Sequence, residues 1–284
     1  MARHFFPCLL VLLVASWSGL AQDAGALIAD AEALYDRWSE AFDFAAYRAD
    51  LEAAIDLYEQ ALDALAPEAV PSHAIVLNRL ARAQFELGTA YLVGDDAKEA
   101  AFAAGKDHAL ASLRLDPAFI ENEASSFRDA LASALDVEAV FWYGTNLGSY
   151  LNYHQIEAIV WGGMRDLPVC YERAIELDPS YLAGAGYRSL ASFYAQVPGF
   201  LGGDLEKARA TYELAIDAGP DFLENAVNLA EHVFLAQDNH YTACTILRDV
   251  EADAGDPVVM NRWPLYNTLA VDRALGLIED HSCP

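Results

Sequence analysis

The chain has 284 residues, of which 55% are apolar, so it can bury a large core within one continuous helical-repeat domain. It carries 17 Lys and Arg against 43 Asp and Glu, a formal net charge of -26. This balance excludes nucleic acid as a partner, because phosphate binding needs a basic surface, and an anionic membrane surface would repel the chain as well. The charge is interpreted either as a solvated acidic coat or as an acidic face that meets a basic partner.

Residues 1–21 have the pattern of a secretory signal peptide. A short polar start containing Arg3 precedes an apolar run from Phe5 to Trp17, and a small-x-small site at Gly19-Leu20-Ala21 predicts cleavage before Gln22. The apolar run is too short to span a bilayer comfortably. Residues 22–284 are then expected to form a single domain.

The position of Cys8 bears on where the exported chain resides. Cys8 lies at the start of the apolar run and not at the cleavage site, so a lipid-anchoring cysteine is missing. We therefore expect a soluble exported protein, periplasmic where the cell has a periplasm. A retained N-terminal anchor is the alternative.

Apolar residues at helical spacing predict helices along the mature chain, and no segment shows sustained strand alternation. About a dozen helices in antiparallel pairs are expected. The predicted ranges in the first half are 24–42, 47–65, a third helix from after Pro67 and Pro71 to about 92, then 98–115, and 117 to about 135.

A short phrase occurs twice and reveals the repeat. Tyr171-Glu-Arg-Ala174-Ile-Glu-Leu-Asp178-Pro179 returns at Tyr212, with Ala215 and a proline in the corresponding places. The small alanine lets helix backbones approach, the tyrosine fills the groove beside it, and the proline is expected to end one helix and preset the next.

Further copies of this phrase begin at Tyr58, which keeps Ala61, and at Ala109, where Ser112 replaces the small alanine. The helix-turn-helix unit is the tetratricopeptide (TPR) pattern, whose usual period is about 34 residues. Because the copies are unevenly spaced, the sequence predicts an all-α, degenerate TPR-like solenoid of helical hairpins.

Aromatic residues cluster with glycines between Val137 and Tyr153, and this composition departs from that of the repeat. Glycine weakens a helix by about 1 kcal/mol relative to alanine, so close helix contact or room for a ligand must offset the cost. The aromatic residues are then core packing or, alternatively, the wall of a cavity in which Asn146 and tyrosine hydroxyls make directional hydrogen bonds.

The loop from Pro198 to Asp204 lies between the two helices of one repeat. Gly202 and Gly203 permit positive φ, and Asp204 is placed to cap the next helix. The loop lacks the Lys and the hydroxyl residue of a phosphate-binding loop. The favoured interpretation is therefore that Asp204 caps the helix and that Phe200 or Leu201 anchors the loop against a neighbouring element.

Three cysteines remain after export. Cys170 and Cys244 fall in predicted helices, where a buried thiol acts as a small apolar residue, although Cys244 could pair with Cys283 in an oxidising compartment. None has metal-site spacing, and the histidines, scattered without a ligand motif, predict no metal or other cofactor. No Ser-centred nucleophile elbow or dinucleotide loop supports an enzyme.

These residues resemble the TatT family, the T component associated with some tripartite ATP-independent periplasmic (TRAP) transporters. The resemblance rests on Phe141-Trp142-Tyr143-Gly144-Thr-Asn146-Leu147-Gly148, on the Tyr171 repeat and above all on Pro198-Gly-Phe-Leu-Gly-Gly-Asp-Leu-Glu-Lys-Ala208. It covers roughly residues 51–250.

The resemblance implies an α-helical periplasmic protein that can form a trimer, docks the transporter's substrate-binding protein and encloses an apolar channel for a hydrophobic ligand. Family members can be lipoproteins, whereas this chain lacks the lipid cysteine. We expect a non-enzymatic scaffold whose aromatic-lined cavity or channel is formed by Trp142, Tyr143, Asn146, Tyr187 and Phe193, and whose loop residues Pro198, Phe200, Gly202 and Gly203 contribute to an interface.

Two rival functions are kept open. A generic TPR adaptor without a small ligand would bind an extended or helical peptide in its concave face. An enzyme would need a deep pocket with converging histidine and carboxylate groups, which the sequence does not indicate.

Overall fold

A computed structural model describes residues 23–39, 42–159 and 162–284. Within these ranges every regular element is a helix and none is a strand, which confirms the all-α prediction. The predicted signal peptide, residues 1–21, lies outside the described residues. None of the described helices is both long enough and apolar enough to cross a membrane.

The helices follow one another closely along the chain. Those of the first half are α1 (Ala24–Tyr35), the 3-10 helix η1 (Asp36–Ser39), α2 (Phe44–Ala64), α3 (Val70–Ala90), α4 (Asp95–Leu113), α5 (Pro117–Glu123), α6 (Phe127–Ser133) and α7 (Val137–Leu151). Those of the second half are α8 (Gln155–Ile159), η2 (Gly163–Arg165), α9 (Leu167–Leu177), α10 (Ala185–Gln196), η3 (Gly199–Leu201), α11 (Leu205–Ala218), α12 (Glu224–Leu229), η4 (Ala230–Phe234), η5 (Leu235–Gln237), α13 (His240–Asp253), α14 (Pro257–Arg262) and α15 (Pro264–Asp280).

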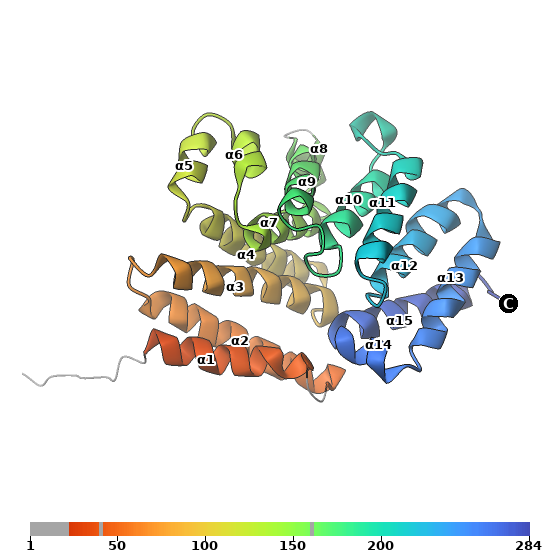
Figure 1. Cartoon of the computed structure of the whole chain (residues 1–284), viewed down its shortest axis with the longest axis horizontal. Coiled ribbons are helices and arrows are strands. Elements are labelled where there is room, and N and C mark those ends of the chain that lie inside the picture. Colours follow the sequence, from red (N-terminus) through yellow and green to blue (C-terminus); the bar gives the residue numbers. More distant parts are fainter. Residues whose placement is uncertain (1–22, 40–41, 160–161) are drawn as a thin grey trace, which may run out of the picture.

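Neighbouring helices stack into one curved solenoid (Figure 1). The stack runs through α1, α2, α3, α4, α7, α9, α10, α11 and α12, each packed on the next, while α5 and α6 form a side branch that contacts α9. The degenerate repeat predicted from the sequence is therefore confirmed as a TPR-like arrangement of helix pairs.

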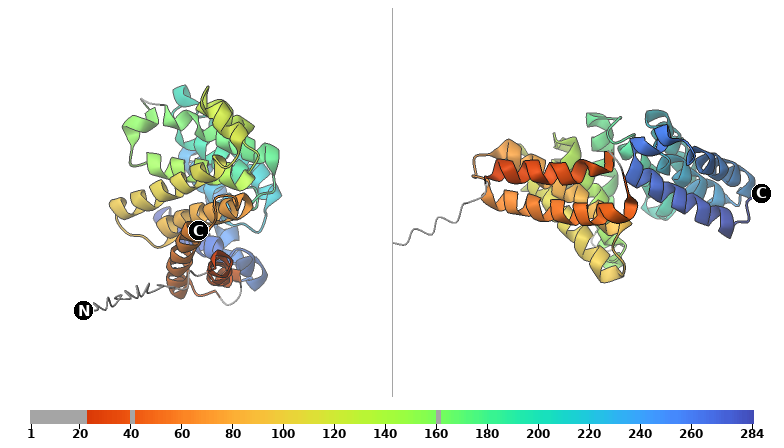
Figure 2. Two further views of the ribbon diagram at one scale, coloured as in Figure 1. Left: turned by 90° about the vertical axis from the view of Figure 1, so that its left-hand side faces the viewer. Right: turned by 90° about the horizontal axis from the view of Figure 1, so that it is seen from below.

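The C-terminal helices return to the first ones (Figure 2). Leu265 at the start of α15 is buried in the same apolar cluster as Tyr35, Tyr58 and Leu80. The ring of Trp263 stacks on that of Trp38, with centroids 6.2 Å apart. The two ends of the solenoid thus share one core, which the repeat pattern did not predict.

The repeat phrase packs as its residue types predicted. Tyr171 and Ala174 in α9 and Tyr212 and Ala215 in α11 are all buried. Small residues also face each other between repeats, because a Cβ on Gly184 would lie 3.0 Å from the carbonyl oxygen of Ala215. These alanines and glycines therefore set the close approach of the helices.

The proline of the phrase plays only one of its two predicted roles. Helix α9 ends at Leu177, as expected before Asp178-Pro179, but α10 begins only at Ala185. The residues between them form a turn in which Leu182, Ala183 and Gly184 have positive φ. Pro179 thus ends one helix without presetting the next.

Two predicted helices are shorter than expected. The range 117–135 contains two helices, because the Ser126 hydroxyl accepts a hydrogen bond from the amide of Asp129 and begins α6 anew. The range 24–42 contains α1 and then η1, since the amide of Asp36 bonds to the carbonyls of Glu32 and Leu34 and tightens the last turn. Residues 40–41 lie outside the described part of the chain.

The cysteines and the glycine-rich loop follow the predictions in most respects. Cys244 and Cys283 form a disulfide that ties α13 to the C-terminus, and Cys170 is a buried free thiol. Asp204 caps α11 by accepting hydrogen bonds from the amides of Glu206 and Lys207. The apolar anchor of the loop is Leu201, which packs on the core, whereas Phe200 is 83% exposed.

Helix α7 is continuous through its glycines. A Cβ on Gly144 would lie 2.7 Å from the Cβ of Cys170 in α9, so this glycine permits the contact between the two helices. The close-contact explanation thus holds for Gly144.

Two glycine substitutions should have opposite effects on stability. Gly144→Ala should lower the free energy of unfolding by about 1–3 kcal/mol, because the added methyl overpacks the contact between α7 and α9. Gly276→Ala on the exposed face of α15 meets no atom within 4 Å and should raise it by about 1 kcal/mol. Urea unfolding followed by circular dichroism measures both, and a neutral Gly144→Ala variant would contradict the proposed contact.

Candidate functional site

The curved stack and the returning α15 line a pocket of about 580 Å³ that is partly open to solvent. Its walls come from α3, α7, α9, α10, α12 and α15, together with η2 and η4. This volume falls within the range of small-molecule sites. The pocket is therefore the candidate functional site.

One face of α7 supplies much of the wall. Trp142, Thr145, Gly148, Ser149 and Asn152 recur at helical spacing and all line the pocket. A Cβ on Gly148 would meet only ordinary contacts from neighbouring side chains. An alanine would therefore fit at position 148, so helix contact requires glycine at 144 but not at 148.

The five residues predicted to line a cavity or channel lie in different places. Trp142 and Phe193 line the pocket, and the Trp142 indole N–H donates to the hydroxyl of Tyr181 at 2.9 Å. Tyr143, Asn146 and Tyr187 are not among the lining residues.

Tyr143 and Asn146 lie on other faces of α7 and serve packing. Tyr143 contacts the ring of Phe127, and burial raises the pKa of its hydroxyl. Asn146 is fully buried, and its amide donates to the carbonyls of Ala81 and Trp142, which links α7 to α3. Tyr187 is half-buried on α10.

The wall formed by α10 and η4 is polar. The Ser192 hydroxyl lies 2.8 Å from the Tyr212 hydroxyl, which lies 2.9 Å from Nδ1 of His232. Burial is the largest cause of the lowered pKa of His232, so its ring is neutral at pH 7. η4 is a single π-helical turn, an irregularity that often occurs at functional sites.

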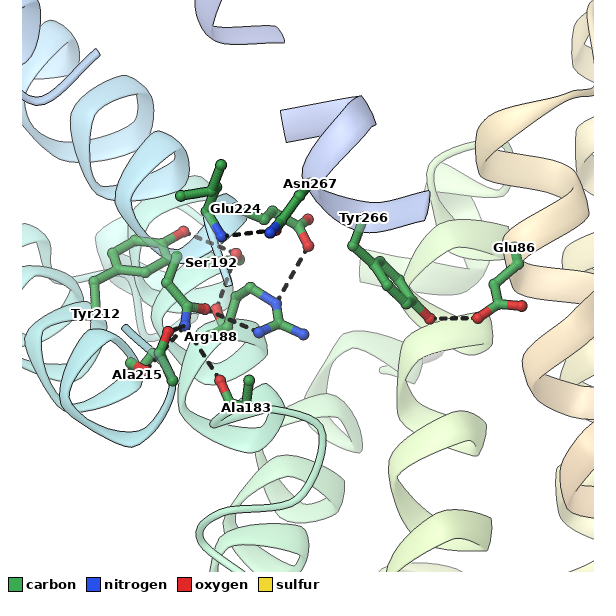
Figure 3. A network of polar contacts seen from close by, with 12 residues as sticks. Glu86, Ala183, Arg188, Ser192, Tyr212, Ala215, Glu224, Tyr266 and Asn267 are labelled. Atoms are coloured by element: carbon green, nitrogen blue, oxygen red, sulfur yellow. Dashed lines mark hydrogen bonds and ion pairs between the residues drawn. The ribbon is translucent and has the colours of Figure 1, made fainter. Parts of the chain in front are cut away.

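Arg188 on α10 is the most buried cation of this wall, with 6% of its surface exposed. Its Nη1 donates to Oδ1 of Asn225 at 2.9 Å, and its Nε lies 3.5 Å from a carboxylate oxygen of Glu224 (Figure 3). Burial is the first cause of the lowered pKa of this guanidinium. A positive charge thus lies at the pocket wall.

A buried polar cluster at the pocket wall joins α3 to α1 and to α15. Glu86 on α3 is 3% exposed and accepts hydrogen bonds from Tyr35 of α1 at 2.8 Å and from Tyr266 of α15 at 2.6 Å. Arg82 forms an ion pair with Glu86 at 2.8 Å. Figure 3 shows Tyr266 reaching across to Glu86. We call Tyr35, Arg82, Glu86 and Tyr266 the closure cluster.

Burial governs the chemistry of the closure cluster. It raises the pKa of the Tyr35 and Tyr266 hydroxyls well above the usual value, so both remain proton donors to Glu86. The Arg82 guanidinium also lies 5.6 to 5.9 Å from the rings of Tyr35, Trp38, Trp142 and Tyr266. Cation–π contacts therefore add to the ion pair.

The predicted interface residues lie outside the pocket but next to it. Pro198, Gly202 and Gly203 shape the turn that follows Val197, a pocket residue. A Cβ on Gly203 would lie 1.8 Å from the carbonyl oxygen of Val197, so the turn excludes any other residue there. Phe200, three residues after Val197, is exposed to solvent.

Sequence reasoning missed the charged residues of the site. Arg82 and Glu86 stand four residues apart, a spacing that pairs opposite charges on a helix, but nothing in the neighbouring residues shows that this pair is buried. Arg188 stands three residues after Ala185 in the segment that follows the repeat phrase. Among the residues that the structure describes, no group of three His, Cys, Asp or Glu is arranged to hold a metal ion.

Residues 96–282 match the protein family described as TRAP transporter T-component, TAtT. An uncharacterized protein of Treponema pallidum (strain Nichols) is 32% identical over 79 residues, which is 28% of this chain and 24% of that protein. The match thus spans about a quarter of the relative's length. Among solved structures, the "TPR2AB-domain:pHSP90-complex of yeast Sti1" shares 14% identity, with a TM-score of 0.32 over 89% of this chain and 98% of that one.

The closure cluster should contribute more to stability than an exposed pair of the same spacing. Glu86→Gln leaves Arg82 uncompensated in the interior and should lower the free energy of unfolding by about 3–5 kcal/mol. The matched control is Glu52→Gln, whose partner Arg48 is also 2.8 Å away but half-exposed, and it should cost about 0.5 kcal/mol or less. Urea unfolding measures both, and equal losses would contradict a structural role for the closure cluster.

Proposed function

Because the chain belongs to the TRAP transporter T-component family, we propose that it is a non-enzymatic exported scaffold that docks the transporter's substrate-binding protein and holds a hydrophobic ligand. The observation that carries the ligand part is the pocket inside the closed solenoid. Phe85, Phe141, Trp142, Phe193 and Tyr266 bring aromatic surface to it. Aromatic and aliphatic walls with a few polar groups are typical of small-molecule sites.

The loop around Phe200 supports the docking part. An 83% exposed phenylalanine on a turn fixed by Gly203 and by the cap at Asp204 is a rigid apolar anchor. Exposed aromatic anchors are the residues that most often dominate protein interfaces. A partner bound there would lie beside Val197 and hence beside the pocket.

Export to the periplasm, passage of ligand through a channel and assembly as a homotrimer complete the proposal. Residues 1–21 supply the signal-peptide pattern. The disulfide between Cys244 and Cys283 supports an oxidising compartment. A trimer would align the pockets of three copies around one axis.

A generic peptide adaptor is the second candidate. An open TPR solenoid offers a concave groove in which an extended or helical peptide lies. The return of α15 to α3 in this chain occupies part of that concave side with its own helix. The helix that occupies the concave side and the small volume of the pocket therefore favour a small ligand over a peptide.

Filling the pocket should weaken ligand binding. Ser189→Phe places a ring where Ser189 lines the pocket, and the affinity for Nile red, a neutral apolar dye, should fall by roughly tenfold or more. Ser189→Ala keeps the space open and serves as the control. Dye fluorescence titration measures both variants, and undiminished binding to Ser189→Phe would place the dye elsewhere.

Removing the exposed ring should weaken docking without affecting the fold. Phe200→Ala should reduce affinity for the substrate-binding protein of the same organism's TRAP transporter by roughly tenfold, with unchanged thermal unfolding, since the ring is solvent-exposed. Tyr241→Ala, which removes an 85% exposed ring on α13, is the matched control. Isothermal titration calorimetry decides, and equal affinities for wild type and Phe200→Ala would exclude this loop from the interface.

A further inference from the structure

The charged residues at the pocket wall differ in how fully they are paired. Glu86 has three partners in the closure cluster, and Glu231 forms an ion pair with Arg273. Among the residues that the structure describes, Arg188 has one acidic partner, Glu224, at 3.5 Å, and the side chain of Glu224 is 41% exposed, so water screens that ion pair. The deepest positive charge at the wall is thus the least compensated.

The position of the Arg188 guanidinium is fixed from behind. Nδ2 of Asn225 donates to the carbonyls of Ala183, Ala215 and Gly219, which orients its Oδ1 toward Nη1 of Arg188. The ring of Phe222 lies 4.1 Å from the guanidinium carbon. Arginine so held has lost its side-chain freedom before any ligand arrives, which favours binding.

Donors of Arg188 remain available at the pocket. A guanidinium has five N–H donors in a planar fork that matches a carboxylate. Within the described residues, Nη2 has no hydrogen-bond partner, and in Figure 3 the guanidinium extends from α10 toward the side on which Tyr266 lies. Arg188 is thus a buried polar side chain that lines the pocket with an unused donor group.

Other elements bring apolar side chains to the pocket. Phe85 on α3, Trp142 on α7 and Leu265 and Leu269 on α15 line it together with Arg188. A ligand that satisfied both Arg188 and this apolar surface would carry one anionic group and an apolar body. A second negative charge would meet Glu224 and Glu231 and be disfavoured.

We infer that the pocket binds an amphipathic monocarboxylate, whose carboxylate is held by Arg188 and whose apolar body lies against Phe85, Trp142 and Leu265. This inference rests on the ligand part of the proposed function and adds to it the polar end of the ligand and the residue that recognises it. Glu224 competes with the ligand for the same guanidinium and so sets the strength of binding.

The test is competition against bound Nile red at neutral pH. Dodecanoate should displace the dye from the full chain at a concentration roughly tenfold lower than dodecanol, because a hydrogen-bonded charge is worth more than the greater apolarity of the alcohol. Arg188→Gln should abolish the difference between the two, and Glu224→Gln should enlarge it. Arg188→Lys keeps the positive charge and should retain part of the advantage of dodecanoate over dodecanol.

Each outcome decides between the two levels of the proposal. If the dye binds but dodecanoate has no advantage over dodecanol in wild type and in Glu224→Gln, the role of Arg188 is overturned and the apolar pocket stands. If neither the dye nor dodecanoate binds, both the carboxylate inference and the ligand part of the proposed function are wrong. Should Arg188→Gln not fold, the comparison of Glu224→Gln with Glu231→Gln still decides, because both variants remove a negative charge from the wall but only Glu224 pairs with Arg188. A larger rise of the acid-to-alcohol ratio in Glu224→Gln supports the role of Arg188, and equal rises overturn it.

Discussion

The ion pair between Arg82 and Glu86 is the interaction on which the rest of the structure depends. Burying two charges is costly, and the cost is offset only where every partner is in place. Here the partners come from opposite ends of the chain, since Tyr35 and Tyr266 both donate to Glu86. The interior charge on α3 is therefore satisfied only when the solenoid has closed on itself.

Closure turns a groove into a pocket. Helical repeats contact only their neighbours, so an open stack exposes its concave side along the whole length. In this chain α15 returns to α3, and Leu265 and Tyr266 enter the core of the first repeats. The same helix then carries Leu269 and Arg273 to the wall opposite α7 and α10. The helix pairs of this chain are of the general TPR-like kind, whereas the set of residues that lines the pocket depends on the return of α15.

The sequence predicted the features that depend on residues close together in the chain. The Tyr-x-x-Ala phrase located the packed helix pairs, and the cap at Asp204 was predicted from residue type and position. Cys244 was favoured as a buried thiol, and its disulfide with Cys283 was the alternative. The single helix expected over 117–135 failed because Ser126 offers the backbone a competing hydrogen bond.

The site was predicted only in part, because helical periodicity does not show which face of a helix meets the interior. Trp142 and Phe193 line the pocket, whereas Tyr143 and Asn146 lie on neighbouring faces of α7. The bond between Glu86 and Tyr266 spans 180 residues and leaves no local signal. The charge on the outside differs from the charge at Arg188: the chain is strongly acidic overall, whereas Arg188 is a buried cation at the pocket wall. An anion is therefore repelled by the chain at a distance and finds a cationic partner only inside the pocket. Delivery by a partner docked at the pocket's edge would overcome that repulsion, so the proposed docking loop and the proposed carboxylate site serve the same step.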